Sequence, residues 1–381
     1  MKRLTSCFLL LGLAVAMLPP SAATAAPTIE TQAEEAFLID AETGAVLLDK
    51  NADQPMPPSS MSKLMTAYIV FDRLQEQRLS LEDKFTVSEK AWRMGGSKMF
   101  VEVGSQVRVE DLLRGVIVQS GNDACIVLAE GLAGSEEAFA EIMNETGREF
   151  GMTGSHFTNA TGWPDPDQRV TARDLATLAK RTILDHPEYY HYYGEKEFTW
   201  SDIRQGNRNP LLYRDIGADG LKTGHTEEAG YGLTASAVQD GRRLILVVNG
   251  LPSMQARADE SDRLLSWGFR EFDNYALFKA GDTVDEATVW LGAEETVPLV
   301  ISQDLKVSLP RSDRDGMQVA VVYDGPIPAP IAAGQEIAKL RVTWPDGMPV
   351  EVPLTAGTEV EQLGAFGRIF ASIKFLLLGS P

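Results

Sequence analysis

The 381-residue chain has few cysteines, few histidines and no excess of positive charge. It contains two cysteines; Cys7 lies in an N-terminal leader, which leaves Cys125 alone, so no internal disulfide is expected. The four histidines show no spacing typical of a metal site, and we expect neither a metal nor an organic cofactor. A formal net charge of -19 argues against nucleic acid as a partner.

Long hydrophobic runs are missing too. The apolar stretch at residues 8–18 is shorter than the roughly 20 residues that span a bilayer. Lys2 and Arg3 precede this stretch, and the small residues 23–25 (Ala-Thr-Ala) follow it. Residues 1–25 are therefore predicted to be a secretory signal peptide, which implies an exported protein.

Three short motifs are present instead, each once and in this order: Ser60-Met61-Ser62-Lys63, Ser120-Gly121-Asn122 and Lys222-Thr223-Gly224. A serine three residues before a lysine shares one face of a helix with it, so the amine can take the proton of the hydroxyl. The second motif adds a hydroxyl and a carboxamide, and the third adds a cation beside a strand. Together they provide a nucleophile, a base, a proton relay and an anion clamp.

Hydrophobic periodicity places these motifs on a mixed α/β or α+β fold. Residues 37–40 and 45–50 predict a hairpin, and residues 231–238 and 244–251 predict another around Asp240-Gly241. Helical spacing predicts helices that begin at Met61 and span residues 109–119, 123–132, 171–183 and 258–269. We therefore expect an antiparallel sheet packed with many helices.

After about residue 274 the pattern changes to short β-rich segments separated by Gly, Pro and Asp, which indicates a small all-β domain. The last segment is an amphipathic helix whose apolar stripe includes Phe366, Ile369 and Phe370. A helix of this kind suits the surface of anionic lipid, although packing on its own domain is the alternative.

From about residue 33 to 361 the chain resembles the low-molecular-mass penicillin-binding proteins that act as D-Ala-D-Ala carboxypeptidases, serine peptidase family S11. The matching stretches surround the motifs and extend beyond them, at residues 58–66, 119–125, 196–199 and 219–226. Gly121 stands where the general signature has Asp, and this favours the carboxypeptidase branch over class A β-lactamases.

The resemblance implies a serine β-lactamase/D,D-peptidase-like α/β (α+β) domain at residues 26–273, an all-β domain at 274–361 and a membrane-anchoring amphipathic helix at 362–381. It also implies a place at the periplasmic face of the bacterial inner membrane, bound peripherally through that helix. The substrate would be a peptidoglycan stem peptide ending in D-Ala-D-Ala, and β-lactam antibiotics would be covalent inhibitors.

The resemblance further assigns catalytic roles. Ser60 would attack the carbonyl between the two terminal D-alanines and form an acyl-enzyme, with Lys63 as its base. Such a base requires a pKa lowered by burial and nearby positive charge, for which Lys222 is the obvious source. Ser120 would relay a proton to the departing D-Ala amine.

The remaining motif residues would bind substrate: Asn122, Lys222, Thr223, Gly224 and His225. The carboxamide would bind the peptide backbone, and the Lys-Thr pair would hold the free carboxylate of the terminal D-Ala. Backbone N–H groups of Ser60 and His225 would form the oxyanion hole. The side chain of His225 could tune the base or only pack.

Several alternatives stay open. On the same fold the chain could act as a weak β-lactamase or a D,D-endopeptidase. A β-lactamase needs a general base for deacylation; Glu188, Glu195 and Glu197 lie in the right stretch, but none is part of a recognisable motif. A binding or structural role is the third possibility. Asp174 is either a charge at a helix start or a group near the site, and Cys125 is interpreted as a small buried residue.

Overall fold

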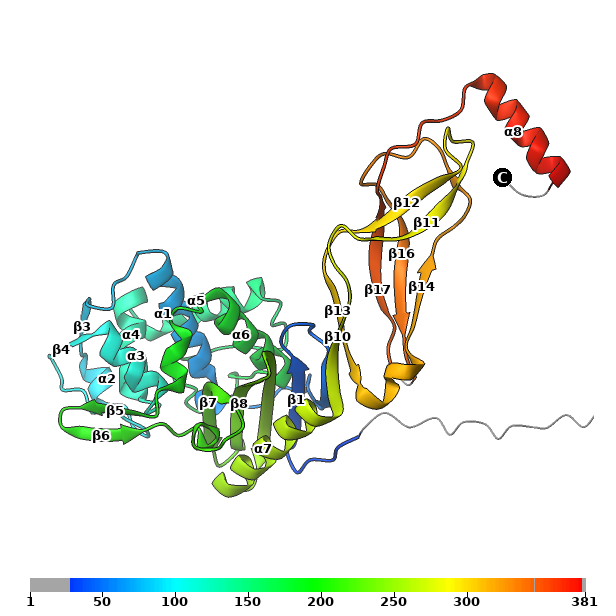
Figure 1. Cartoon of the computed structure of the whole chain (residues 1–381). Helices are drawn as coiled ribbons and strands as arrows, with labels where there is room; N and C mark the ends of the chain where they lie inside the picture. The colour runs from blue at the N-terminus through cyan, green and yellow to red at the C-terminus, as the bar shows by residue number, and fades with distance from the viewer. Residues whose placement is uncertain (1–27, 346, 379–381) are drawn as a thin grey trace, which may run out of the picture.

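The computed structural model describes residues 28–345 and 347–378, and the predicted signal peptide lies outside them. Figure 1 shows two parts: a wide part that carries most of the helices, and a narrow β-rich part that ends in helix α8. The three motifs all lie in the first part.

The first part is built on a five-stranded antiparallel sheet of order β2-β1-β9-β8-β7. Its strands are β1 (Glu35–Asp40), β2 (Val46–Lys50), β7 (Ala218–Thr226), β8 (Gly230–Gln239) and β9 (Arg242–Leu251). Both predicted hairpins are confirmed, as β1-β2 and β8-β9. The third motif lies inside the edge strand β7.

Both faces of this sheet are covered, because alternate residues of its strands enter different cores. Phe37 and Ile39 of β1 pack with the helical core, whereas Ala36 and Leu38 pack against helix α7. One face carries α1 (Lys63–Gln75), α2 (Glu89–Arg93), α3 (Val109–Ile117), α4 (Asn122–Ala133), α5 (Glu136–Glu149) and α6 (Ala172–Asp185), and α7 (Met254–Glu271) lies on the other. This arrangement places the first two motifs at the junction of helices and sheet, where Ser60 is half-buried and the other motif residues are buried.

Local sequence explains several helix starts. Thr171, Ser135 and Ser253 each accept a backbone N–H at the N-terminus of α6, α5 and α7. The predicted helix at 258–269 is longer in the structure because Ser253 caps it five residues earlier. Two small two-stranded sheets, β3 (Lys84–Thr86) with β4 (Gln106–Arg108) and β5 (Glu197–Trp200) with β6 (Ile203–Gly206), complete this part.

The C-terminal domain is all-β up to its terminal helix, as expected. A two-stranded ribbon of β10 (Phe272–Phe278) and β13 (Leu305–Pro310) leads into a sheet of order β14-β16-β17-β12-β11-β15. These strands are β11 (Thr283–Trp290), β12 (Thr296–Ile301), β14 (Gln318–Val322), β15 (Ile327–Pro328), β16 (Glu336–Thr343) and β17 (Val350–Ala356). The domain has its own hydrophobic core, separate from the two cores of the first part.

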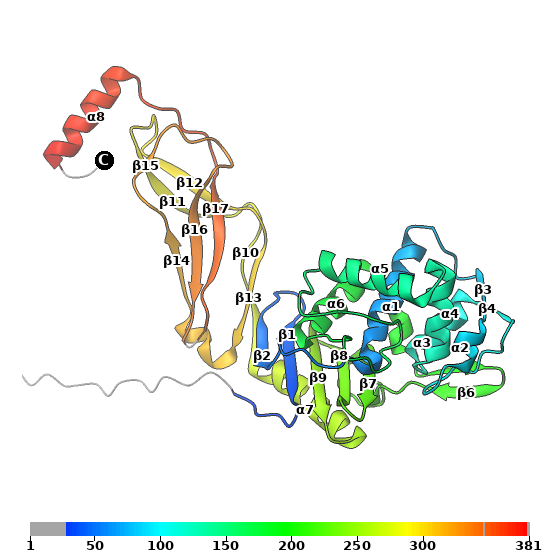
Figure 2. The same ribbon diagram turned by 180° about the vertical axis from the view of Figure 1, so that it is seen from behind.

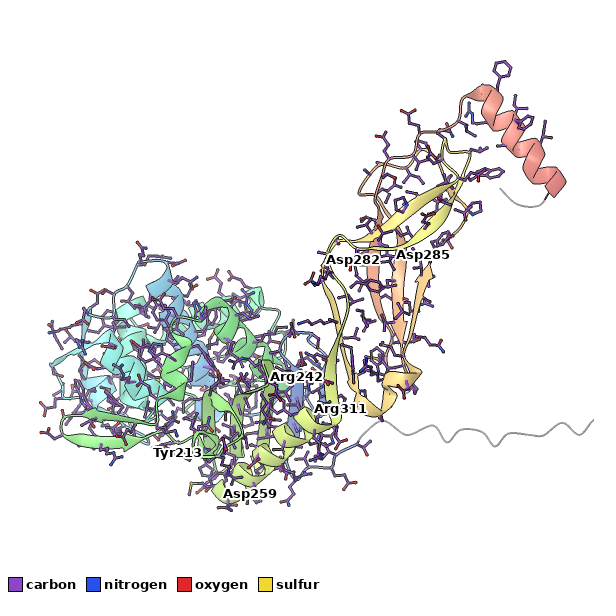
Figure 3. All side chains as sticks on the ribbon, viewed as in Figure 1. Tyr213, Arg242, Asp259, Asp282, Asp285 and Arg311 are labelled. Carbon is purple, nitrogen blue, oxygen red and sulfur yellow. The ribbon has the colours of Figure 1, made fainter. Side chains whose placement is uncertain are left out.

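Polar contacts join the two parts. Arg242 on β9 donates to the Phe272 carbonyl oxygen of β10 at 2.7 Å, and Lys306 of β13 pairs with Glu42 at 2.5 Å. Within the C-terminal part, Arg311 pairs with Asp273 of β10 at 2.8 Å. Figure 3 labels both arginines at this junction.

Helix α8 (Ala365–Leu378) stands at the far end of the C-terminal domain (Figures 1 and 2). Its aromatic residues Phe366 and Phe370 are 91% and 77% exposed, and Ile369 is 60% exposed. Within residues 28–345 and 347–378, no helix is both long and apolar enough to cross a membrane.

Candidate active site

Ser60 and Lys63 are neighbours in space, as their spacing predicts. The helix predicted to begin at Met61 begins two residues later, at Lys63. Ser60 lies immediately before it, in the 3-10 helix η1 (Ser59–Ser62). Lys63 is the first residue of α1, and its Nζ lies 2.9 Å from Ser60 Oγ. The serine therefore sits on a tight turn beside the amine.

The contacts of Lys63 fix how its amine is oriented. Nζ lies 2.7 Å from Asn122 Oδ1 and 2.5 Å from the Thr161 carbonyl oxygen, and the side chain is 1% exposed. Both oxygens only accept, so each takes one N–H of the amine. A neutral amine has two N–H groups, and its remaining lone pair then faces the Ser60 hydroxyl.

The second motif connects α3 to α4. Ser120 takes a left-handed conformation (φ 65°), and its buried Oγ has no hydrogen-bond partner among the described residues. Asn122 bridges two segments, because its Oδ1 meets Lys63 while its Nδ2 donates to the Gly95 carbonyl oxygen at 2.9 Å. The motif thus supplies one buried hydroxyl without a partner and one fixed amide.

The third motif brings β7 against η1. A Cβ on Gly224 would lie 3.0 Å from Ser59 Cβ and 3.1 Å from Met61 Cγ, so only glycine allows this close approach. Lys222 is 2% exposed, and among the described residues its Nζ has a single hydrogen bond, at 3.4 Å to the Thr223 carbonyl oxygen. The Lys222 amine therefore has N–H donors available for a ligand.

His225 lies at the exposed end of the motif. Its ring stacks on Tyr231 of β8, with centroids 3.9 Å apart. The Arg257 guanidinium of α7 lies over the same Tyr231 ring at 5.8 Å. The side chain of His225 is therefore held by an aromatic neighbour.

Burial sets the protonation of the two amines. It is the largest cause that lowers the pKa of Lys63 from 10.5 to about 8; the positive charge of Arg208 lowers this pKa further, while the carboxylates of Asp123 and Glu136 oppose the change. The pKa of Lys222 falls well below 10.5, first through burial and then through the charge of Lys63. Repulsion between two ammonium groups is mutual, so the pair favours losing a proton.

Two groups at this site were missed by sequence reasoning. The Thr161 carbonyl belongs to the backbone, so no residue type marks it. Arg208 reaches the site from a loop and donates to Ser97 Oγ at 2.6 Å, but it belongs to no periodic pattern or motif. Lys222 was expected to be the cation that lowers the pKa of Lys63, but the cation that does so is Arg208, and Lys63 instead lowers the pKa of Lys222.

The residues considered as alternatives lie in other contacts. Asp174 accepts from Gly154 N at 3.0 Å and Ser155 Oγ at 2.7 Å, and it has no hydrogen bond to a motif residue. Glu195 pairs with Arg114.

Glu197 pairs with Arg204, whereas the backbone oxygen of Glu188 meets the His191 ring. Cys125 is fully buried, and burial raises the pKa of its thiol to about 12, so it is not a thiolate. Across the described part of the chain, no cluster of His, Cys, Asp and Glu is arranged to hold a metal.

Comparisons with known proteins agree with this geometry. Residues 21–253 match the family model described as D-alanyl-D-alanine carboxypeptidase, and residues 272–362 match that of the penicillin-binding protein 5 C-terminal domain. The chain is 40% identical over 370 residues to the D-alanyl-D-alanine carboxypeptidase DacC of Escherichia coli, covering 93% of this chain and 92% of the relative.

Solved structures give the same result. Penicillin-binding protein 5 from Haemophilus influenzae superimposes with a TM-score of 0.80 at 38% identity, over 88% of this chain and 99% of that one. Penicillin-binding protein D2 from Listeria monocytogenes, solved in its ampicillin-bound form, aligns with a TM-score of 0.59 at 30% identity, over 64% of this chain and 99% of that one.

Proposed function

Because this chain belongs to the D-alanyl-D-alanine carboxypeptidase family of serine peptidases, we propose that it removes the terminal D-alanine from peptidoglycan stem pentapeptides through an acyl-enzyme on Ser60. The observation that carries this proposal is the Lys63 amine, which has two carbonyl acceptors and Ser60 Oγ as its three partners.

In the first step Ser60 Oγ attacks the carbonyl carbon between the two D-alanines while neutral Lys63 takes its proton. The pKa of about 8 leaves a usable fraction of neutral amine near neutral pH. The charge that develops on the carbonyl oxygen would be stabilised by the backbone N–H groups of Ser60 and His225.

In the second step the C–N bond breaks and the D-Ala amine leaves with a proton. Ser120 suits the relay, because its buried Oγ has no other partner in the described residues. The proton taken by Lys63 passes through this hydroxyl to the amine, which leaves Lys63 neutral again. Water then adds to the acyl carbon with Lys63 as base, and Ser60 recovers its proton as the shortened peptide departs.

Substrate binding uses the other motif residues. Lys222 and Thr223 hold the carboxylate of the terminal D-Ala, and Arg208 adds a second cation on this side of the site. Lys222 makes no ion pair among the described residues, so an incoming carboxylate supplies the missing charge. Asn122 binds the peptide backbone, and Gly224 supports the cleft by letting β7 approach η1.

A β-lactam would react with the same atoms, because its ring carbonyl replaces the scissile amide and its carboxylate replaces that of D-Ala. The ampicillin-bound relative supports this part of the proposal. A β-lactamase main activity is less favoured, since Glu195 and Glu197 are engaged with Arg114 and Arg204. D,D-endopeptidase action on cross-linked peptides uses the same chemistry and stays an alternative.

The chain beyond the active site would place it at its substrate. We assign residues 1–25 to export, 26–273 to catalysis, 274–361 to a stand-off domain and 362–381 to the anchor. The exposed Phe366, Ile369 and Phe370 of α8 suit the interface of anionic lipid at the periplasmic face of the inner membrane.

The test is mass spectrometry of the products from a peptide ending in D-Ala-D-Ala, with and without benzylpenicillin. We expect the loss of one alanine, complete block by the drug, and neither activity nor drug labelling in Ser60→Ala. Release of alanine by Ser60→Ala would refute the assignment of the nucleophile.

A further inference from the structure

Asp123, one residue past the second motif, is a fully buried carboxylate that forms no ion pair within the described residues. Its oxygens accept four backbone N–H groups: those of Met99 (2.8 Å), Phe100 (2.8 Å), Val101 (3.3 Å) and Ala124 (3.0 Å). A charge in the interior is stable only when such bonds replace its water. Three of these four donors come from one loop, residues 94–101.

That loop forms contacts with the active site. The Gly95 carbonyl oxygen accepts from Asn122 Nδ2 (2.9 Å), and the Ser97 carbonyl oxygen accepts from Asn122 N (2.7 Å). Ser97 Oγ accepts from Arg208 at 2.6 Å. The loop therefore touches both the amide that faces Lys63 and the cation that lowers its pKa.

The loop has little regular structure of its own. Residues 94–101 include no helix or strand, and Gly96 and Phe100 take positive φ values of 73° and 68°. Without a helix or sheet ladder, its backbone N–H groups need another acceptor. The carboxylate of Asp123 is that acceptor for three consecutive residues.

We propose that Asp123 is a positioning residue for the peptidase reaction: its carboxylate fastens the 94–101 loop to the start of α4, so that Asn122 and Arg208 face the substrate. This inference rests on the proposed function, and it adds a role that none of the three motifs contains.

A purely structural role for Asp123 predicts lower stability and nothing more, so the test needs a matched control. Asp174 is also buried at a helix start and accepts Gly154 N and Ser155 Oγ, away from the motifs. We would compare Asp123→Asn with Asp174→Asn in the full chain, measuring the rate of Ser60 acylation by a fluorescent penicillin and the melting temperature. We expect Asp123→Asn to be acylated at least tenfold more slowly than the wild type and Asp174→Asn to be acylated at the wild-type rate, while the two variants have similar melting temperatures.

Two further readouts separate positioning from stability. Ser97→Ala should slow acylation about fivefold in the wild-type background and much less in Asp123→Asn, because both changes release the same loop. The acid limb of the pH profile is the second readout: loss of the Asp123 charge alone moves it to lower pH, whereas release of the loop also withdraws the Arg208 charge and moves it back toward higher pH. Glu136, the other carboxylate that acts on Lys63, is unchanged in this variant.

Equal acylation rates in Asp123→Asn and Asp174→Asn would overturn the inference, as would the same Ser97→Ala effect in both backgrounds. If Asp123→Asn does not fold, Ser97→Ala alone decides: an unchanged rate contradicts the role of the loop. Wild-type protein that penicillin does not label would instead overturn the proposed function itself.

Discussion

The pKa of Lys63 gives the sharpest prediction. A fall in the pKa from 10.5 to about 8 means that the protein destabilises the charged amine by about 3 kcal/mol relative to the neutral one. The largest cause is burial, since Lys63 is only 1% exposed. At pH 7 about one tenth of the amines are then neutral, and at pH 9 about nine tenths are neutral. Since only the neutral amine can take the Ser60 proton, acylation should be about tenfold faster at pH 9 than at pH 7.

Stopped-flow acylation by a fluorescent penicillin, followed between about pH 6 and pH 10, measures this limb without turnover. Arg208→Gln removes a positive charge that lowers the pKa of Lys63, so the limb should move to higher pH. Arg214→Gln is the control, because Arg214 pairs with Asp259 and Asp262 on the surface. A profile that is flat between pH 6 and pH 9 would refute Lys63 as the general base.

Three other changes test separate parts of the site and chain. Lys222→Gln should raise KM for a D-Ala-D-Ala peptide at least tenfold while the protein stays folded, because the substrate carboxylate loses its buried cation; an unchanged KM would contradict the clamp. Gly162→Ala should destabilise the fold by about 2 kcal/mol or more in urea unfolding, since φ is 78° and a Cβ would lie 1.7 Å from the Ser59 carbonyl oxygen. A chain that ends at Gln362 should no longer sediment with anionic vesicles yet keep full activity on a soluble peptide; vesicle binding equal to that of the full chain would rule out α8 as the anchor.

The sequence predicted the reacting side chains because their chemistry depends on residue type and spacing. Ser60 and Lys63 are three residues apart, so they met as expected, and the Asp240-Gly241 turn between two strand-like runs predicted the β8-β9 hairpin. The motif Ser120–Asn122 was placed correctly between two helices. The left-handed conformation of Ser120 was not predicted, because glycine rather than serine usually marks such a turn.

The groups of the site that were not predicted reach it through tertiary contacts. The third partner of Lys63 is a backbone carbonyl, brought close only when the loop at Thr161 packs on α1. Arg208 acts from a loop whose position is fixed by its contact with Ser97 and not by periodicity.

The central claim is that Ser60 carries the acyl group, and mass spectrometry of the intact protein after brief exposure to benzylpenicillin tests it most directly. The wild-type protein should gain the mass of one drug molecule, located by digestion on the peptide that contains Ser60, and Ser60→Ala should gain none. An adduct of the same mass on Ser60→Ala, or on a different peptide of the wild type, would contradict the account.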